Sequence, residues 1–168
     1  MDLPGRSWGG YPRVRQRIVR LERRDAPLPA GTERLLAHGN GRSYGDVCLN
    51  ADGTLLHTRG LDRFIAFDAE AGLLRCEAGV LLGEILDLVV PRGWFLPVLP
   101  GTQFVTVGGA IANDVHGKNH HRVGSFGHHV LRLELLRSDG QRLECSADEH
   151  ATLFAATIGG LGLTGLVT

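Results

Sequence analysis

The chain has 168 residues, 43% of them apolar, which is enough for one domain with its own hydrophobic core. Its 18 basic residues balance 18 acidic ones, so no net positive field favours a nucleic acid partner. No apolar run is long enough to span a bilayer, and the N-terminus lacks the apolar segment of a signal peptide. We therefore expect a cytoplasmic protein, in which the widely separated Cys48, Cys76 and Cys145 remain free thiols.

The chain opens irregularly, with Trp8 and Tyr11 in a segment that we expect to attach the N-terminus to the domain surface. Residues 13–24 then alternate arginines with apolar side chains over much of their length, and this period of two predicts a strand with one solvent-exposed face. The arginines could attract an anionic lipid headgroup or a phosphorylated substrate. The simpler interpretation is a solvated strand face beside Glu22 and Asp25.

Short apolar segments separated by turn-forming residues come next. They predict strands at 35–38, 54–58, 64–68 and 73–78. These strands are short and come in pairs without regular helical crossovers. This order is typical of an α+β domain and argues against regular βαβ alternation.

Two helices are expected in the middle of the chain. From residue 81 the apolar period changes to that of a helix, and the pattern continues to residue 89, where Pro91 and Gly93 stop it. A second, short helix is expected over 107–113. Its N-terminus would face the ligand, which is favourable for a pyrophosphate.

The last third of the chain predicts a hairpin and a helix. Leucines alternate with charged residues over 131–135, and residues 138–140 form a turn before the return strand. A helix is expected over 148–157. The chain then ends at Thr168 inside an expected strand, so we expect an N-terminal fragment in which residues 1–168 form one domain and a C-terminal substrate domain is absent.

The most unusual stretch of the sequence is 100–127, PGTQFVTVGGAIANDVHGKNHHRVGSFG. It combines six glycines, small apolar residues and a nearly unbroken run of polar side chains. Glycine lets the backbone take left-handed conformations or approach another group closely. We interpret this stretch as a wall against a large, flat, partly charged ligand.

A second glycine-rich stretch, 38–46, has the sequence HGNGRSYGD. Successive backbone N–H groups in such a loop can form an anion site, and Arg42 and Ser43 add donors suited to phosphate oxygens. The stretch is neither a P-loop nor a Rossmann fingerprint, because the required spacings are absent. An ordinary glycine turn is an equally good interpretation of these residues alone. A third stretch, 158–167, again alternates glycines with aliphatic residues and predicts close backbone packing before a buried strand.

Together the motifs GNGRSYGD, PGTQFVTVGGAIANDVHGKNHHRVGSFG and ATIGGLGLTGLV resemble the FAD-binding domain of the vanillyl-alcohol-oxidase type flavoproteins. Within that superfamily the chain is most similar to the decaprenylphosphoryl-β-D-ribose 2′-oxidases and their relatives, over residues 7–168. The resemblance implies the two-subdomain PCMH-type FAD-binding fold. In that fold a small N-terminal α+β subdomain precedes a larger antiparallel sheet with flanking helices.

The resemblance also implies which residues serve the site. His116 and Lys118 are the candidate catalytic residues on the substrate side of the flavin. The histidine would take or orient the hydroxyl proton, and the lysine would bind a substrate phosphate or stabilise flavin charge. For His116, a purely supporting hydrogen bond to the flavin is the alternative. The implied cofactor-binding residues are Gly39, Asn40, Gly41, Arg42, Ser43, Tyr44, Gly45, Asp46, Gly101, Thr102, Val107, Gly108, Gly109, Ala112, Asn113, Asp114, His116, Gly117, Asn119, His120 and Val167.

Tyr44 bears on how the cofactor is held. Many members of the superfamily carry a histidine in this loop that bonds covalently to the flavin, whereas this chain has Arg-Ser-Tyr-Gly there. The resemblance therefore implies FAD that is bound non-covalently.

By the same resemblance, the chain belongs to a FAD-dependent oxidoreductase that acts on CH–OH groups. It would oxidise a secondary alcohol of a sugar by hydride transfer to flavin. The substrate would be a polyprenyl-phosphate pentose bound through the missing C-terminal domain. A reductase partner and peripheral attachment to the inner membrane face are compatible with this function. The alternatives are an aldonolactone oxidase and a fragment that binds FAD without catalysis.

A metallo-hydrolase is the remaining alternative. It would use a cluster of histidines in which His116 and His120 have the i, i+4 spacing of a metal-binding pair on a helix. Gly117 and Asn119 disfavour a helix there. No matching acidic ligand is found in the sequence, so we expect no metal site. The histidines concerned are His116, His120, His121, His128 and His129.

Overall fold

Three short strands form a parallel sheet near the N-terminus of the computed structural model, which describes residues 4–31 and 34–168. The spatial order is β1 (Arg17–Arg20), β3 (Thr54–His57) and β2 (Leu35–His38). The central strand β3 is buried along its whole length, so its residues do not alternate between buried and exposed as those of a half-exposed strand would. The parallel pairing could not be read from the sequence, because the connections carry no helical pattern.

Strand β1 is shorter than the 13–24 segment expected to be extended. Its ladder with β3 starts opposite Thr54 and ends opposite His57, because β3 leads directly into the 3-10 helix η1 (Thr58–Gly60). Arg15, just before the strand, binds the carboxylate of Asp52 through two nitrogens at 3.0 and 3.1 Å. The solvated face expected for these arginines is therefore present over a shorter strand.

A two-stranded antiparallel ribbon and a helix follow. The ribbon consists of β4 (Phe64–Asp68) and β5 (Leu73–Cys76), as expected from the sequence. Helix α1 (Leu82–Val89) begins where the side chain of Glu84 accepts a hydrogen bond from the backbone N–H of Leu81 at 2.7 Å. The helix continues into the 3-10 helix η2 (Val90–Arg92) and stops at Gly93, which adopts a left-handed φ of 82°.

The C-terminal part forms a second three-stranded sheet, which is antiparallel, in the order β7 (Arg142–Ser146), β6 (Arg132–Leu136) and β8 (Leu166–Val167). Helix α4 (Ala151–Thr157) covers it and begins later than the expected 148–157. The delay has a local cause, because the Ser146 hydroxyl accepts hydrogen bonds from the two backbone N–H groups of residues 148 and 149 and forms a turn there.

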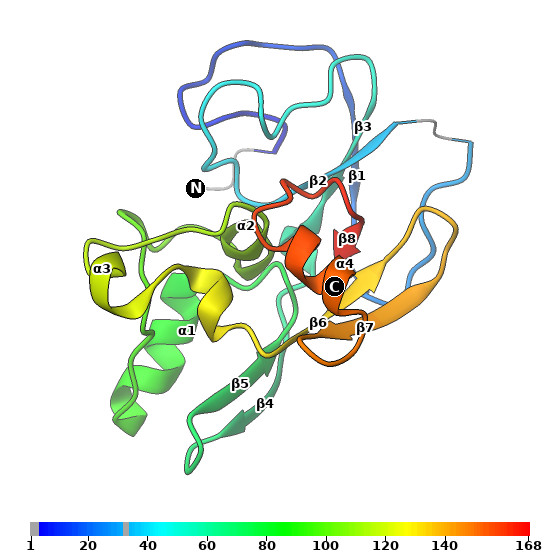
Figure 1. Ribbon diagram of the computed structural model, residues 1–168. Helices are drawn as coiled ribbons and strands as arrows, with labels where there is room; N and C mark the ends of the chain where they lie inside the picture. Colours follow the sequence, from blue (N-terminus) through cyan, green and yellow to red (C-terminus); the bar gives the residue numbers. More distant parts are fainter. Residues whose placement is uncertain (1–3, 32–33) are drawn as a thin grey trace.

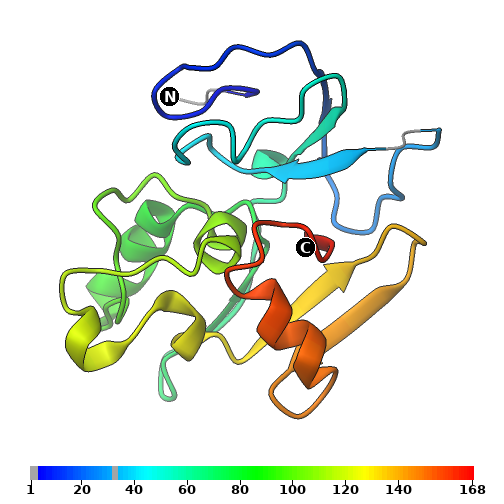
Figure 2. The same ribbon diagram turned by 45° about the horizontal axis from the view of Figure 1, so that its top comes forward.

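Three short helical segments occupy the middle of the chain: α2 (Val107–Ala112), α3 (His120–Val123) and η3 (Phe126–His129). Helix α2 joins two of the three core clusters, since Ala110 packs with α1 and Ile111 packs with β6 and α4. Figures 1 and 2 show the parallel sheet on one side of α2 and β8, with α1, α3 and the C-terminal hairpin on the other. Within the part of the chain described, no helix is long and apolar enough to cross a membrane.

Candidate functional site

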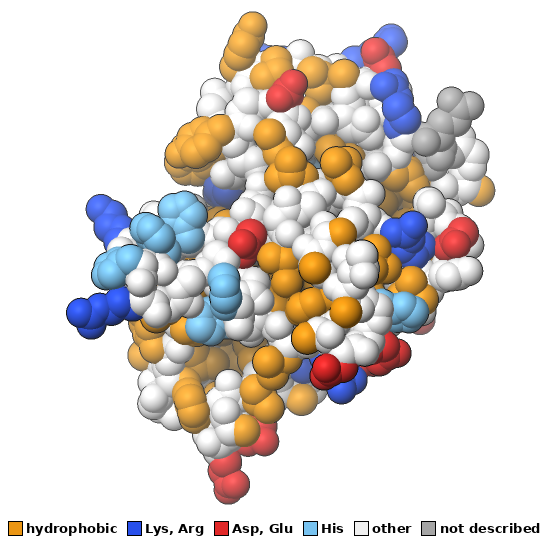
Figure 3. All heavy atoms as spheres, viewed as in Figure 1, with side chains coloured by type: hydrophobic (Ala, Val, Ile, Leu, Met, Phe, Trp, Pro, Cys, Tyr) orange, Lys and Arg blue, Asp and Glu red, His pale blue; other side chains and the backbone are white. Residues whose placement is uncertain are grey.

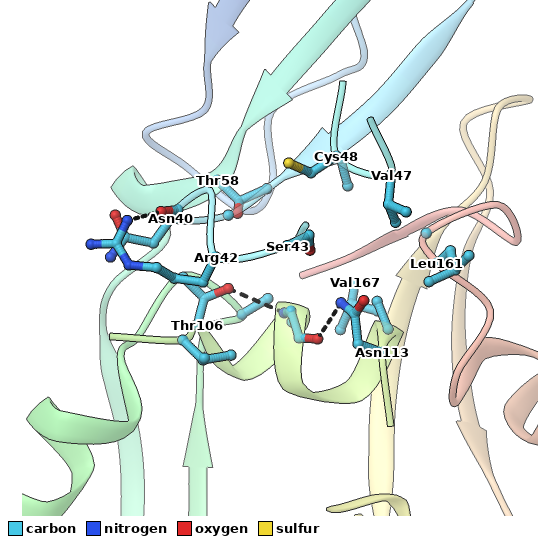
Figure 4. Close-up of a pocket in the computed structure, with 18 of the residues that line it drawn as sticks. Asn40, Arg42, Ser43, Val47, Cys48, Thr58, Thr106, Asn113, Leu161 and Val167 are labelled. Carbon is cyan, nitrogen blue, oxygen red and sulfur yellow. Dashed lines mark hydrogen bonds between the residues drawn. The ribbon is translucent and has the colours of Figure 1, made fainter. Parts of the chain in front are cut away.

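A cavity of about 400 Å³ lies where the three glycine-rich stretches of the sequence meet (Figure 4). It lies between the loop that follows β2, helix α2 and the segment that leads into β8. The lining residues are Ala37, Gly39, Asn40, Gly41, Arg42, Ser43, Tyr44, Val47, Cys48, Thr58, Ala78, Val105, Thr106, Gly108, Gly109, Ala112, Asn113, Val115, Leu161, Gly162, Gly165, Leu166 and Val167.

The first wall is the loop that follows β2. Gly39 lies so close to Thr106 that a methyl group there would overlap its Oγ1 and sit 3.3 Å from its Cγ2. The side-chain nitrogen of Asn40 donates to the carbonyl of Phe104 at 2.9 Å. A glycine and an amide thus attach this loop to the segment that precedes α2.

Helix α2 forms the second wall. Thr106 caps it, because its Oγ1 accepts a hydrogen bond from the backbone N–H of Gly109 at 3.1 Å. Gly108 donates its N–H to the carbonyl of Ala78 at 2.8 Å, and a Cβ on Gly108 would lie 3.1 Å from the Ala78 methyl. The helix expected near 107–113 is therefore present, and its glycines let it approach Ala78 closely.

The third wall comes from the segment between α4 and β8. The backbone N–H of Gly159 donates to Ile111 at 2.9 Å, and the N–H of Leu161 donates to Ala112 at 2.8 Å. Gly162 has a left-handed φ of 76°, which turns the chain back towards β8. The expected close backbone packing of this stretch is thus realised against the end of α2.

The cavity is almost free of charge. Among the described residues that line it, Arg42 is the one with a formal charge, and no carboxylate is present. The guanidinium of Arg42 donates to the carbonyl of Asn40 at 2.5 Å. The side-chain oxygen of Asn40 is buried and accepts no hydrogen bond from the described part of the protein. Cys48 is half-buried in the wall, and this burial raises the pKa of its thiol.

The structure brings about half of the sequence-predicted cofactor residues into this wall. The residues of this set that line the cavity are Gly39, Asn40, Gly41, Arg42, Ser43, Tyr44, Gly108, Gly109, Ala112, Asn113 and Val167. The residues that lie outside it are Gly45, Asp46, Gly101, Thr102, Val107, Asp114, His116, Gly117, Asn119 and His120.

Asp114 illustrates why some of them lie outside. It takes a left-handed φ of 43° at the end of α2, and its Oδ1 accepts a hydrogen bond from the backbone N–H of Gly127 at 2.9 Å. A methyl on Gly127 would overlap Ile158. Asp114 therefore joins α2 to η3 behind the cavity wall.

The two candidate catalytic residues, His116 and Lys118, are exposed on the segment that follows Val115, a lining residue. The ring of His116 meets that of His120 edge to face, with 5.1 Å between the ring centroids. Asn119 fixes the segment by donating to the carbonyl of Pro97 at 3.0 Å.

Figure 3 shows histidine side chains gathered over α3 and η3, with basic side chains at the margin. No group of three or more histidine, cysteine or carboxylate side chains within residues 4–31 and 34–168 could hold a metal ion.

Sequence reasoning missed several lining residues. Leu161, Gly162 and Gly165 are among those missed, although the glycine pattern of the stretch 158–167 predicts backbone that packs closely and could have identified them. Thr58 begins η1 and Ala78 lies two residues after β5, so neither carries such a signal, and both reach the cavity only through the fold.

Comparison with known proteins gives a consistent result. The sequence profile of the family described as FAD binding domain matches residues 30–146. Decaprenylphosphoryl-beta-D-ribose oxidase of Mycolicibacterium smegmatis is 45% identical over 151 residues, which cover 89% of this chain and 32% of that protein. L-gulonolactone oxidase of Mus musculus is 33% identical over 131 residues, which cover 77% of this chain and 29% of that protein. A putative D-arabinono-1,4-lactone oxidase of Neurospora crassa is 28% identical over 153 residues, or 91% of this chain and 26% of that protein.

These matches confirm the resemblance predicted from the three glycine-rich stretches, the PCMH-type α+β fold and FAD as the cofactor. The chain spans about a third or less of the length of these curated relatives.

Proposed function

Because the chain belongs to the FAD binding domain family, we propose that it is the cofactor-binding part of a FAD-dependent oxidase that acts on a secondary alcohol of a sugar. The observation that carries this proposal is the cavity at the junction of the three glycine-rich stretches, with its near-neutral wall and single arginine. The 45% identity to a sugar oxidase over most of the chain supports the substrate class.

The residues of the cavity fit FAD by their chemistry. FAD combines an anionic pyrophosphate with a large, flat, uncharged ring system, and the wall offers backbone N–H groups, one guanidinium and small apolar side chains without any carboxylate among its described residues. The buried oxygen of Asn40 is an acceptor without a protein donor in the described residues, and FAD has hydroxyl and N–H donors that could satisfy it.

We assign the holding of the cofactor to three groups of residues. The loop 39–46 would take the pyrophosphate through backbone N–H groups. The N–H groups of Gly108 and Gly109 are bonded within the protein, so these two glycines would instead let the cofactor approach α2 closely. Asn113 and the backbone of Val167 would contact the remainder. The resemblance also implies residues that lie outside the cavity wall, such as Gly101 and His120, and they stay part of this proposal.

The chemistry that bound FAD would supply is acceptance of the hydride that leaves the alcohol carbon. The proton of the same hydroxyl must pass to a base, and we assign that role to His116, because imidazole is the commonest general base of proteins. Lys118 would bind a phosphate group of the substrate. His116 directly follows the lining residue Val115, Lys118 comes three residues after it, and both side chains are exposed, so we place them where a substrate would approach the cavity.

FAD is proposed to bind without a covalent bond to the protein. Among the described residues that line the cavity, none is a histidine, and Tyr44 stands in the loop where a histidine would form the bond. Cys48 is the thiol in the same wall. Burial raises the pKa of its thiol, which keeps the reactive thiolate scarce. Acid or denaturant should therefore release all flavin from the protein, and flavin fluorescence that stays in the protein band of a denaturing gel would contradict this assignment.

The substrate proposed first is a polyprenyl-phosphate pentose, supported by the name of the bacterial relative. A sugar lactone is the second candidate, supported by two lactone oxidases among the relatives. Because the chain spans about a third of its relatives, the proposal concerns a protein that carries this chain together with a substrate domain. A reductase partner and peripheral attachment to the inner membrane face belong to the same proposal.

The test measures flavin absorbance in a protein that includes this chain and its substrate domain, without oxygen. A short-chain prenyl-phosphoryl pentose should bleach the flavin band, and L-gulono-1,4-lactone should not. His116→Ala should slow this bleaching by at least about a hundredfold while FAD remains bound. Bleaching by the lactone alone would favour the second candidate. An unchanged rate in the His116 variant would remove the assigned base.

A further inference from the structure

The guanidinium of Arg42 lies between two aromatic rings at one end of the cavity. Its central carbon is 5.1 Å from the centre of the Trp8 ring and 5.8 Å from the centre of the Phe104 ring. Both distances are within the range of cation–π attraction, and a planar guanidinium can stack on both rings at once. Figure 4 shows the Arg42 side chain turned towards its own loop, with its dashed bond to Asn40.

The same three segments are also joined by hydrogen bonds. The backbone N–H of Trp8 donates to the carbonyl of Ser43 at 2.9 Å, and the side chain of Asn40 donates to the carbonyl of Phe104 at 2.9 Å. The glycine-rich loop is therefore attached on one side to the N-terminal segment and on the other to the segment that leads into α2. Arg42 lies at the centre of these attachments.

Neither ring serves the hydrophobic core. Trp8 is 50% exposed and Phe104 is 45% exposed, and neither belongs to the three clusters of buried apolar residues. Trp8 and Phe104 thus lie at the surface, and both contact the guanidinium of Arg42 there. This placement points to a role in shaping the loop.

We propose that Trp8 and Phe104 are positioning residues, which clamp Arg42 and hold the glycine-rich loop in the shape that receives FAD. The inference rests on the proposed location of the cofactor in this cavity. A loop that adopts the binding shape only part of the time weakens the apparent affinity in proportion to that fraction. Loss of one ring should raise the dissociation constant for FAD about fivefold, which corresponds to about 1 kcal/mol.

The experiment compares FAD dissociation constants, measured by titration of flavin fluorescence, for the purified chain and four variants. Trp8→Leu removes the ring and Trp8→Phe restores one. Arg42→Lys keeps the charge but loses the planar group that stacks. The control is Trp94→Phe, because Trp94 packs on Gly72 and donates to Ala69 at 2.8 Å, outside the cavity wall.

We expect the dissociation constant to rise about fivefold in Trp8→Leu and at least as much in Arg42→Lys, and to stay within twofold in Trp8→Phe and Trp94→Phe. Near-normal binding by Arg42→Lys would mean that Arg42 supplies charge only, and it would overturn the clamp. Unchanged binding by Trp8→Leu would do the same. Either result would leave the proposed oxidase function intact.

A second measurement needs no cofactor. The chain contains two tryptophans, so Trp94→Phe leaves Trp8 as the only indole. In that background Arg42→Ala should shift Trp8 emission to longer wavelength and increase its quenching by acrylamide, because the ring loses its cover. Emission and quenching that do not change would contradict the stack itself, whatever the protein does with FAD.

Discussion

Replacing Gly39 by alanine tests whether the contact between Gly39 and Thr106 determines how the loop 39–46 packs on the start of α2. The new methyl would overlap Oγ1 of Thr106 and lie 3.3 and 3.4 Å from its Cγ2 and Cβ. Thr106 is 2% exposed, so it cannot move outward, and it can relieve the overlap only by turning its hydroxyl away. That turn breaks its cap on the N–H of Gly109.

The expected cost has two parts. Loss of a threonine cap destabilises a protein by about 1 kcal/mol, and one extra methyl in a filled site costs about 1–3 kcal/mol. Gly39→Ala should therefore lower the free energy of unfolding by about 2–4 kcal/mol, measured by urea denaturation with an unchanged slope. The FAD dissociation constant should rise in parallel, because Gly39 and Thr106 both line the cavity.

A substitution at Gly9 serves as the control, and a double variant at Gly39 and Thr106 decides whether their contact is the cause. Gly9→Ala should be nearly neutral, because nothing lies within 4 Å of its added methyl. Thr106→Ala alone should cost about 1 kcal/mol. The double variant Gly39→Ala/Thr106→Ala should cost little more than Thr106→Ala, because the methyl then occupies vacated space. If the loss of unfolding free energy in the double variant equals the sum of the losses in the two single variants, the contact between Gly39 and Thr106 is not the cause of the destabilisation.

Two further predictions concern the junction behind the cavity wall and the thiol in the wall. Gly127→Ala should lower the free energy of unfolding by about 1–3 kcal/mol, because its methyl would overlap Ile158 and lie 2.9 Å from Oδ1 of Asp114; a loss below about 0.5 kcal/mol in urea denaturation would contradict the tight junction. Saturating FAD should slow alkylation of Cys48 at least about tenfold, measured by mass spectrometry, because this thiol lines the cavity. Without FAD the Cys48 rate should rise with pH as the thiolate forms, at higher pH than for an ordinary thiol because burial raises its pKa, and Cys76, whose pKa burial raises to about 12, should stay unlabelled at pH 8. Equal Cys48 rates with and without FAD would argue against this cavity as the cofactor site.

Local patterns predicted the elements well where a short-range cause fixed them. The strand at Leu35–His38, the ribbon and helix α1 appear at the expected positions because turn residues and apolar periods bound them. The helix at Ala151–Thr157 starts late because a serine side chain bonds the preceding backbone, a competition that periodicity cannot reveal.

The candidate site was predictable only in part. Glycine-rich stretches identify backbone that must pack closely, and all three of them meet at the cavity. Which of their side chains face it depends on contacts between distant segments. Asp114, for example, reaches Gly127 instead, and Thr58 enters the wall through the parallel pairing of β2 and β3, which no local pattern encodes.

The arginines of β1 have a consequence for how this molecule behaves among copies of itself. β1 is an outer strand of its sheet, and outer strands offer unpaired backbone groups to which another chain can add. Arg17 and Arg20 are exposed on it and form no ion pair with any residue in the described ranges. A second copy that approached this edge would bring like charges together, which opposes pairing. The alternation that suggested an anionic ligand thus also protects the sheet against aggregation.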